Sequence, residues 1–378
     1  MNDRLTGALR QTFEQLADDG GPPSGLAQAA LAGARRRRRA QVGASVGLAV
    51  CAVLAAAGVA VGGDQGAPVA AGSGGSVIAA YSGIRDRTVE DGSPAFNYSM
   101  LLDRETGIYR RLPYRAAIPS PDGDQVLVET GDNSLAYPSR LGIMDRATGV
   151  VRWMTDGADG RVPGFPGNAD DGVWSPDGRR ILFRFGYGTD PPGVVVLDAE
   201  TLRAEFAPMP YVSVGDVGLE WTSDGAGFVL TEAQAPGESN AYVARGVRFF
   251  GLDGRPRRTL DVPDPGLWAK PVFSPGGQLA LSGPIGVDRP LSIAVVDPDT
   301  GAVRARFSLA GRGVVVGWAD ESHLLVCTYD GRDAQHLQVV DLTGVVTKRM
   351  VPPDGAAGGQ ITIGPAAGLP RSADGLTF

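Results

Sequence analysis

The chain has 378 residues and a formal net charge of −7, with 55 Gly and 28 Pro. This acidic balance argues against nucleic-acid binding, which needs a broad basic face. The Gly and Pro content approaches that of low-complexity chains, but these residues recur at regular turn positions, which favours a turn-rich, all-β fold.

Residues 1–39 are expected to form a short cytoplasmic leader that ends in five consecutive Arg at 35–39. Four apolar residues fall on one face of a predicted helix that ends before Pro22: Leu5, Leu9, Phe13 and Leu16. A helix of this length is marginal in water by itself. Three interpretations of residues 1–34 therefore stay open: a solvated and partly helical leader, a segment that binds a cytoplasmic protein, and a segment on the membrane surface.

Residues 40–62 are predicted to form a transmembrane helix, because no charged residue occurs from Ala40 to Gly63. A helix of this length crosses a bilayer core of roughly 30 Å. The Arg cluster should remain in the cytoplasm, which places the N-terminus inside and the following domain outside after a single pass. Three alternatives remain: a signal peptide cleaved near Val69-Ala70-Ala71, a lipid anchor at Cys51, and a buried helix of a soluble protein.

Residues 63–75 consist mainly of Gly, Ala and Ser and should form a flexible linker. A linker of about thirteen such residues has an r.m.s. span of roughly 20 Å. It would hold the outer domain, predicted over residues 76–365, near the membrane without fixing its orientation. Residues 366–378 would then form a C-terminal tail.

Within residues 76–365, a turn between two short apolar runs occurs five times. In the copy WSPDGRRILF (174–183), Pro176 sets φ for the first corner, Asp177 can bond its own backbone, and Gly178 can take a positive φ. The residues after the turn alternate with the period of a strand. The copies start at Ile118, Trp174, Trp221, Phe273 and Trp318, with spacings of 56, 47, 52 and 45 residues.

A second pattern, an apolar run followed by Asp and usually Thr-Gly, alternates with the first and predicts another strand, turn and strand. It occurs in six copies, two of them degenerate: residues 101–112, 143–154, 196–206, 251–260, 295–307 and 339–350. Each repeat thus contains four antiparallel strands in roughly 40–50 residues, which is the signature of a β-propeller blade. One blade cannot bury both of its faces, whereas blades stacked around an axis do so.

The SPDG hairpin, recurring in register with the second pattern, resembles the blades of the TolB-type, WD-repeat-like β-propeller family. The resemblance covers roughly residues 76–365. It implies a propeller fold and implies little about function, because propellers have many functions. The chain departs from the family pattern in two respects: no blade ends in Trp-Asp, and the last SPDG-like turn has decayed to ADES (319–322).

Counting the repeats predicts an all-β, six-bladed propeller, with five or seven blades as alternatives. The first blade opens weakly at VIAAY (77–81) and has no SPDG turn. The segment QITIG (360–364) is expected to pair with this opening and close the ring.

The sequence indicates no catalytic, cofactor-binding or metal-binding site. The two His residues of the chain, His323 and His336, fall in the last blade, and we interpret them as surface or turn residues rather than catalytic bases. A GxSxG pattern at 43–47 lies inside the predicted membrane span, where it cannot serve as a hydrolase nucleophile turn. The segment DPDTG (297–301) resembles the start of a calcium loop but lacks the later ligands.

The Cys and Trp residues are interpreted mainly as packing residues. Cys51 lies in the predicted membrane span and Cys327 in a predicted strand, so the two cannot form a disulfide. Trp153 lies outside the repeat register, as does Trp268, for which core packing and an exposed contact both stay open. Three Trp occupy equivalent positions and are expected to pack between blades: Trp174, Trp221 and Trp318.

These features predict a membrane-anchored, extracytoplasmic propeller that binds a protein, glycan or cell-wall ligand without catalysis and without a cofactor. Residues 157–172 and 233–246 are the longest irregular stretches and are candidate binding loops. A second hypothesis is transmembrane regulation, in which residues 1–34 bind a cytoplasmic partner such as an extracytoplasmic-function sigma factor. A third is an enzyme with a site in the propeller channel, which the scarcity of His disfavours.

Overall fold

The computed structural model of the chain describes residues 76–85, 97–131, 140–154, 172–185, 193–209, 217–234, 243–261, 271–283, 290–329, 335–354, 356, 359–366 and 369. The predicted leader, membrane span and linker (residues 1–75) lie outside the described residues, as does most of the predicted tail. Within the described ranges, no helix is long and apolar enough to cross a membrane.

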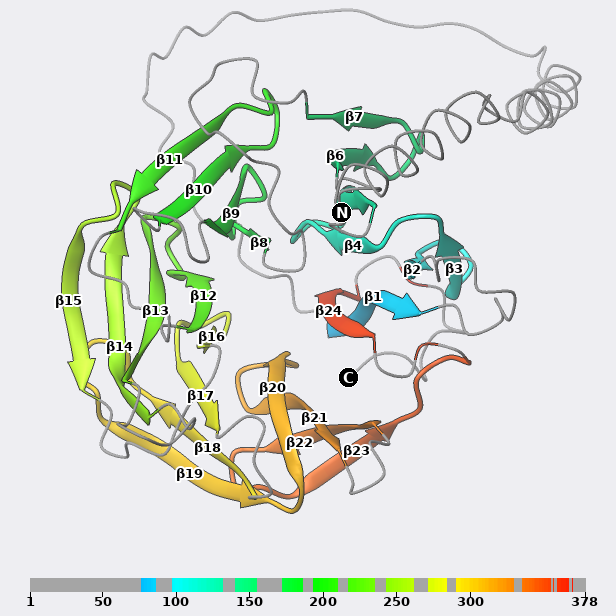
Figure 1. Cartoon of the computed structure of the whole chain (residues 1–378). Helices are drawn as coiled ribbons and strands as arrows, with labels where there is room; N and C mark the ends of the chain where they lie inside the picture. The colour runs from blue at the N-terminus through cyan, green and yellow to red at the C-terminus, as the bar shows by residue number, and fades with distance from the viewer. Residues whose placement is uncertain are drawn as a thin grey trace, which may run out of the picture. The chain divides into compact units, whose positions relative to one another are not determined.

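Six antiparallel sheets of four strands each are arranged as blades around one ring (Figure 1). The arrangement confirms the predicted all-β, six-bladed propeller. In blades 2 to 6 the strands follow one another in the chain, from the innermost strand near the ring centre to the outermost strand. Blade 1 differs, because its innermost strand comes from the end of the chain.

Blade 1 consists of β1 (Ser76–Arg85), β2 (Asn97–Asp103) and β3 (Ile108–Leu112), with β24 (Gln360–Pro365) as its innermost strand. Blade 2 consists of β4 (Ala116–Pro119), β5 (Gln125–Thr130), β6 (Arg140–Asp145) and β7 (Val151–Trp153). Blade 3 consists of β8 (Val173–Trp174), β9 (Arg180–Phe185), β10 (Gly193–Asp198) and β11 (Ala204–Pro208).

Blade 4 consists of β12 (Val217–Trp221), β13 (Gly227–Gln234), β14 (Val243–Gly251) and β15 (Pro256–Asp261). Blade 5 consists of β16 (Val272–Phe273), β17 (Leu279–Gly283), β18 (Leu291–Val296) and β19 (Val303–Leu309). Blade 6 consists of β20 (Arg312–Trp318), β21 (His323–Tyr329), β22 (Gln335–Asp341) and β23 (Val346–Met350).

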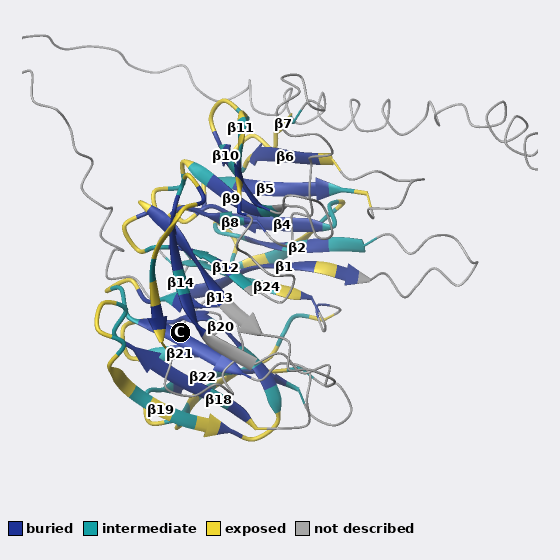
Figure 2. Ribbon diagram, turned by 60° about the vertical axis from the view of Figure 1, so that its left-hand side comes forward, coloured by how far each residue is buried: buried dark blue, intermediate teal, exposed yellow. Residues whose placement is uncertain are grey.

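The middle strands of the blades are buried on both faces, whereas the outermost strands alternate (Figure 2). The four central residues of β5 and all five residues of β17 are buried. The outermost strand β23 instead alternates between half-buried and exposed residues. Neighbouring blades cover both faces of the inner strands, so these strands need continuous apolar runs, and the core is divided among the interfaces between blades.

The ring is closed by pairing between the two ends of the described chain. β24 runs antiparallel to β1, with Ile363 opposite Ile78, which confirms the pairing predicted for the QITIG segment. Arg104, in the turn after β2, donates from Nη2 to the carbonyl oxygen of Pro365 (3.2 Å). Its Nη1 donates to the carbonyl oxygen of Asp122 in blade 2 (2.8 Å). Arg104 therefore ties the end of the closing strand to two blades.

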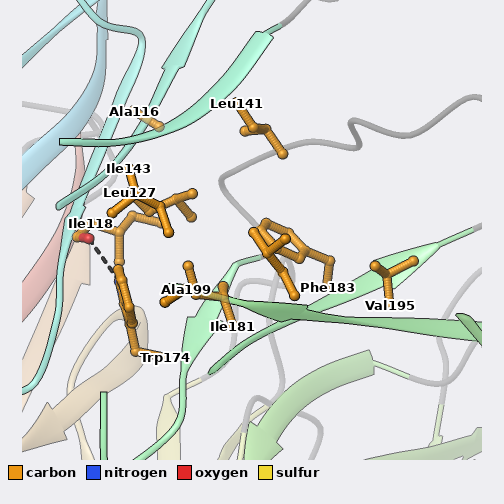
Figure 3. Packing of buried hydrophobic residues seen from close by; sticks show 11 residues of the cluster. Ala116, Ile118, Leu127, Leu141, Ile143, Trp174, Ile181, Phe183, Val195 and Ala199 are labelled. Carbon is orange, nitrogen blue, oxygen red and sulfur yellow. Dashed lines mark hydrogen bonds between the residues drawn. The ribbon is translucent and has the colours of Figure 1, made fainter. Parts of the chain in front are cut away.

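Three indole rings link consecutive blades, as predicted from their repeat positions. Each Nε1–H donates to a carbonyl oxygen in the innermost strand of the preceding blade: Trp174 to Ile118 (2.9 Å), Trp221 to Val173 (2.8 Å) and Trp318 to Val272 (2.9 Å). Figure 3 shows the first of these bonds among the side chains packed between blades 2 and 3. Each ring thus fills an interface and also satisfies a backbone acceptor.

The structure corrects the register of the first repeat by one residue. The backbone N–H of Ser120 bonds the carbonyl oxygen of Gln125, and that of Ser175 bonds the carbonyl oxygen of Arg180. The two serines are therefore equivalent, and Pro119 rather than Ile118 is the counterpart of Trp174. The first spacing is then 174 − 119 = 55 residues. Pro119 interrupts the apolar run before the turn, and the sequence pattern therefore places Ile118 opposite the Trp.

Replacing Trp221 by Phe should lower the free energy of unfolding by about 1–2 kcal/mol, because the Val173 carbonyl loses its donor while most of the burial remains. Urea denaturation followed by circular dichroism measures the change. Trp153→Phe is the matched control, because the Trp153 ring is half-buried and makes no hydrogen bond to the described residues. Equal losses in the two variants would contradict the role given to the indole N–H.

The second turn of each blade is built around an Asp side chain. In DAETL (198–202) and DPDTG (297–301), Oδ1 of the Asp accepts hydrogen bonds from the N–H and the hydroxyl of the Thr. Gly301 closes its turn with a φ of 74°, and Leu202 takes the same place with a φ of 57°. DPDTG therefore serves as a turn of the repeat, as interpreted from the sequence.

Candidate functional site

The strand order gives the propeller two different ends. Because neighbouring strands are antiparallel, the turn between the first and second strands of a blade and the turn between its third and fourth strands lie at the same end. We call this end the turn face, and Figure 2 shows its exposed turns toward the left. It comprises residues 104–107, 120–124, 146–150, 175–179, 199–203, 222–226, 252–255, 274–278, 297–302, 319–322 and 342–345.

The described strands that flank the candidate binding loops predicted from the sequence end away from the turn face, and little of the loops themselves is described. Of residues 157–172 only 172 is described. The predicted loop 233–246 is corrected at both ends, because residues 233–234 belong to β13 and 243–246 to β14, whose pairing extends beyond the apolar runs. Residues 235–242 and Trp268 lie outside the described residues. Trp153 is half-buried near the end opposite the turn face, with its ring centroid 6.1 Å from that of Tyr114. All turns of the turn face are described, so the geometry of a site can be built there.

Arginine side chains tie neighbouring blades together on the turn face. Arg180 of blade 3 donates from Nη2 to the carbonyl oxygen of Gly225 in blade 4 (3.0 Å). The same guanidinium lies over the ring of Trp221, with 5.0 Å between its Cζ and the ring centroid. Arg152 of blade 2 donates in a similar way to the carbonyl oxygen of Ala199 in blade 3 (2.8 Å). The planar guanidinium, with five N–H donors, suits such bridges between backbone acceptors.

The Arg180 guanidinium and the Trp221 indole have no counterparts between blades 4 and 5, although Arg258, like Arg152, donates to a backbone carbonyl of the next blade (Asp299, 3.4 Å). The turn register makes Gly227 the counterpart of Arg180 and Phe273 the counterpart of Trp221. A Cβ at position 227 would lie 2.1 Å from the carbonyl oxygen of Phe250, so only glycine fits there. The space left between the two blades is a cavity of about 700 Å³ on the turn face, which we call the blade 4–5 groove.

The groove is lined by side chains of both charges and by small polar residues. They come from the turns before β13, β17 and β19 and from the outermost strands β15 and β19. The charged residues are Asp224, Arg257, Arg258, Asp297, Asp299 and Arg304. The small or uncharged polar residues include Thr222, Ser223, Gly276, Gly277 and Gln278.

Four of the charged side chains form two pairs in the groove wall. Nη2 of Arg304 lies 2.7 Å from Oδ2 of Asp297, within blade 5. Nη2 of Arg258 lies 3.4 Å from Oδ1 of Asp299, across the boundary between the blades, and its Cζ lies 3.9 Å from the centroid of the Phe249 ring. The hydrogen bond from Arg304, reinforced by donors of the turn, holds the pKa of Asp297 well below its usual range. This carboxylate is therefore charged at neutral pH.

Arg257 stands apart from these pairs. Its side chain is exposed and makes no hydrogen bond or ion pair to the described residues. The guanidinium lies against the backbone of Gly251, because a Cβ there would be 2.7 Å from Nη2 and 2.8 Å from Nε. Oδ1 of Asp253 would be 2.7 Å from the same Cβ. Glycine at position 251 therefore makes the space that the Arg257 guanidinium occupies.

The first turn of blade 5 is completed by a residue of blade 6. In blade 3, Asp177 accepts a hydrogen bond from the hydroxyl of Ser175 (2.5 Å). Blade 5 has Gly276 in the place of that Asp, and Oε2 of Glu321 accepts the hydrogen bond from Ser274 instead (2.9 Å). The ADES turn, which the sequence presents as a decayed copy, thus supplies the carboxylate that the preceding turn lacks.

The reactive residues discussed from the sequence lie elsewhere. Nδ1 of His323 lies 3.0 Å from the Asp320 carboxylate and 3.0 Å from the Ser322 hydroxyl, so both neighbours meet one ring nitrogen, unlike a nucleophilic triad. Cys327 is buried, and burial raises the pKa of its thiol. Among the described residues, no group of three or more His, Cys, Asp or Glu could hold a metal ion.

Sequence reasoning did not identify any residue of the groove as a binding residue. The available signal was a departure from the repeat: blade 3 reads WSPDGRRI, whereas blade 4 reads WTSDGAGF and blade 5 reads FSPGGQL. The loss of the Arg in blade 4 and of the Trp in blade 5 marks the interface that lacks the Arg180-type and Trp221-type contacts.

Comparisons with known proteins give structural similarity only. No protein-family model matches the chain, and no curated protein matches it. TolB from Acinetobacter baumannii is 16% identical with a TM-score of 0.47, over 77% of this chain and 66% of that chain. The putative TolB from Agrobacterium tumefaciens is 15% identical with a TM-score of 0.47, over 77% of this chain and 98% of that chain. The β-propeller domain of the Trilobed protease from Pyrococcus furiosus is 12% identical with a TM-score of 0.44, over 68% of this chain and 75% of that chain.

These proteins include both TolB and a protease domain, so the similarity does not distinguish a binding protein from an enzyme. The six-bladed fold itself rests on the sheet order and the strand pairing of this chain.

Proposed function

We propose that the protein is a membrane-anchored, extracytoplasmic propeller that binds a protein or other ligand without catalysing a reaction. The observation that carries the proposal is the blade 4–5 groove, where counterparts of Arg180 and Trp221 are missing and the Arg257 guanidinium makes no hydrogen bond to the described residues. A concave site on a rigid framework, lined by a few fixed polar groups, is typical of ligand binding. The anchor is proposed from the Arg cluster and the uncharged run that follows it, residues 35–63.

The non-catalytic role is proposed from the chemistry of the residues at hand. The chain has two His residues, and His323 bonds its own turn in blade 6. The carboxylates Asp297 and Asp224 of the groove accept hydrogen bonds from their own turns, which favours a structural role over proton transfer. Turnover of a substrate by the purified chain would replace this proposal with the enzyme hypothesis.

A second candidate function is transmembrane regulation. It is favoured by the amphipathic pattern of residues 1–34, which would face the cytoplasm in the proposed topology. A partner of this segment, such as a sigma factor, would then respond to ligand binding by the propeller.

Capture of partners from solubilised membranes tests the proposed function. The full chain and a chain lacking residues 1–34, which keeps the Arg cluster and the span, serve as parallel baits, and mass spectrometry identifies what they retain. We expect extracytoplasmic partners or ligands that both baits retain equally. A cytoplasmic protein retained only by the full chain would support regulation instead, and a propeller that retains nothing would contradict both candidate functions.

A further inference from the structure

We propose that the blade 4–5 groove binds a neutral, hydroxyl-rich ligand of the chemical class of an oligosaccharide. The inference rests on the proposed binding function and assigns it a place and a ligand class. Its first support is charge balance, because three Arg and three Asp line the groove. Neither an anion nor a cation gains a strong net attraction there. A neutral ligand that carries both donors and acceptors can use both kinds of side chain.

The paired charged groups of the groove are held in place by contacts within the protein. Asp297 is fixed by Arg304 and by its own turn, and Arg258 is fixed between Asp299 and the Phe249 ring. A carboxylate and a guanidinium each present two parallel positions for hydrogen bonds, which match adjacent hydroxyl groups of a sugar ring. Because these side chains are already ordered, binding costs little conformational entropy.

Arg257 supplies donors that the described part of the chain leaves unused. Its exposed guanidinium makes no hydrogen bond to the described residues, and its position is set by the lack of a side chain at Gly251. Oδ1 of Asp253 faces the same glycine while its Oδ2 lies 3.8 Å from Nε of Arg255, and the three Asp of the groove balance its three Arg. The N–H groups therefore suit neutral oxygen acceptors such as hydroxyl or ring oxygens better than they would suit a strongly anionic group.

The apolar part of the groove is small. Phe249 and Phe250 are 6% and 2% exposed, and the Arg258 guanidinium covers the first of these rings. Phe273 is half-buried and offers a limited aromatic surface, suited to the apolar face of one sugar ring. Peptide ligands that anchor through several apolar side chains would find no comparable pockets among these residues. The volume of about 700 Å³ lies within the range of roughly 300–1,000 Å³ that is usual for small-ligand sites.

Screening of the full chain against an array of neutral oligosaccharides tests the proposal. The protein is purified in a detergent with a phosphocholine head group, which contains no sugar, and binding constants are then measured by calorimetry. Trigalacturonic acid and trialanine serve as the anionic and the peptide comparisons. We expect at least one neutral oligosaccharide to bind, and both comparisons to bind about tenfold more weakly or worse. Absence of any neutral binder, or a preference for either comparison, would overturn the proposal.

Three variants locate the binding site. Arg257→Ala should weaken binding about tenfold, because it removes the unused donors. Phe273→Trp should abolish binding while keeping the melting temperature, because it refills the interface and offers an N–H to the Glu220 carbonyl, as Trp221 does to Val173. The matched control is Arg179→Ala, which removes an exposed Arg from the turn face of blade 3. Equal weakening by both Ala variants, or undiminished binding by Phe273→Trp, would place the ligand elsewhere.

The outcome separates this inference from the function on which it rests. If no oligosaccharide binds but the propeller still captures an extracytoplasmic partner, the groove assignment fails and the binding function stands. If the chain binds neither, both fail. Gly251→Ala gives a further check, because it keeps every charged group of the groove and displaces the Arg257 guanidinium; it should weaken binding as Arg257→Ala does.

Discussion

Replacing Glu129 by Gln is expected to lower the free energy of unfolding by about 3–5 kcal/mol. Glu129 lies on β5 with a side chain that is 0% exposed, and its Oε2 lies 2.7 Å from Nη2 of Arg115, which is 13% exposed. The substitution keeps the volume of the side chain and removes the charge. The Arg115 guanidinium then remains in surroundings of low polarity without this carboxylate. Removing one partner of a buried ion pair destabilises the folded state because the other charge stays buried without compensation.

Urea denaturation at neutral pH measures the effect of Glu129→Gln. Glu105→Gln is the matched control, because Glu105 is exposed in the turn after β2, and it should change the free energy of unfolding by less than about 0.5 kcal/mol. The double variant Arg115→Met, Glu129→Leu should recover most of the loss, because neither charge then remains buried. Equal stability of Glu129→Gln and the unaltered chain would show that the pair contributes nothing.

Removing residues 359–378 is expected to destroy cooperative unfolding of the propeller. The truncation takes away β24, the innermost strand of blade 1, and leaves the inner edge of β1 without its partner. It also removes the apolar contacts of Ile361 and Ile363 in the interface between blades 6 and 1, worth roughly 3 kcal/mol for two half-buried side chains. Calorimetry should show a broad or absent transition where the full chain gives a sharp one.

A milder variant keeps this test informative if the truncated chain does not fold. Arg104→Ala keeps β24 and removes the two hydrogen bonds to Pro365 and Asp122, and it should lower the free energy of unfolding by about 1–3 kcal/mol. A truncated chain that unfolds as sharply and at the same temperature as the full chain would contradict closure of the ring by β24.

The architecture could be predicted from the sequence because its signals are local. The SPDG and Asp-Thr-Gly turns bond within a few residues, as Ser175 and Asp177 do, so each copy specifies its hairpin without help from other blades. The alternation of the two turns then gives the order of the strands. The segment QITIG (360–364) belongs to neither pattern, and the first blade lacks an opening hairpin, so the sequence pairs this segment with the first strand of blade 1. The one-residue error at Ile118 arose where Pro119 interrupts the apolar run before the turn.

The candidate site could not be predicted because it depends on contacts between blades. The groove exists where Gly227 and Phe273 stand in place of Arg180 and Trp221, and a missing side chain gives no positive signal in a sequence. The hydrogen bond that Glu321 accepts from Ser274, in the turn that contains Gly276, likewise depends on a contact between two blades. Each residue by itself resembles decay of a repeat, and only the neighbouring blade shows that the two changes complement each other.

Thiol labelling in intact cells tests the central claim, a propeller held outside the membrane, most directly. The chain carries Cys51→Ser, Cys327 stays buried, and one new cysteine is introduced either at Val351, which is 89% exposed, or at Ser24 in the leader. A membrane-impermeant maleimide should label Val351→Cys in intact cells and Ser24→Cys only after the membrane is permeabilised. Labelling of Ser24→Cys in intact cells, with Val351→Cys protected until permeabilisation, would reverse the topology and contradict the proposed function.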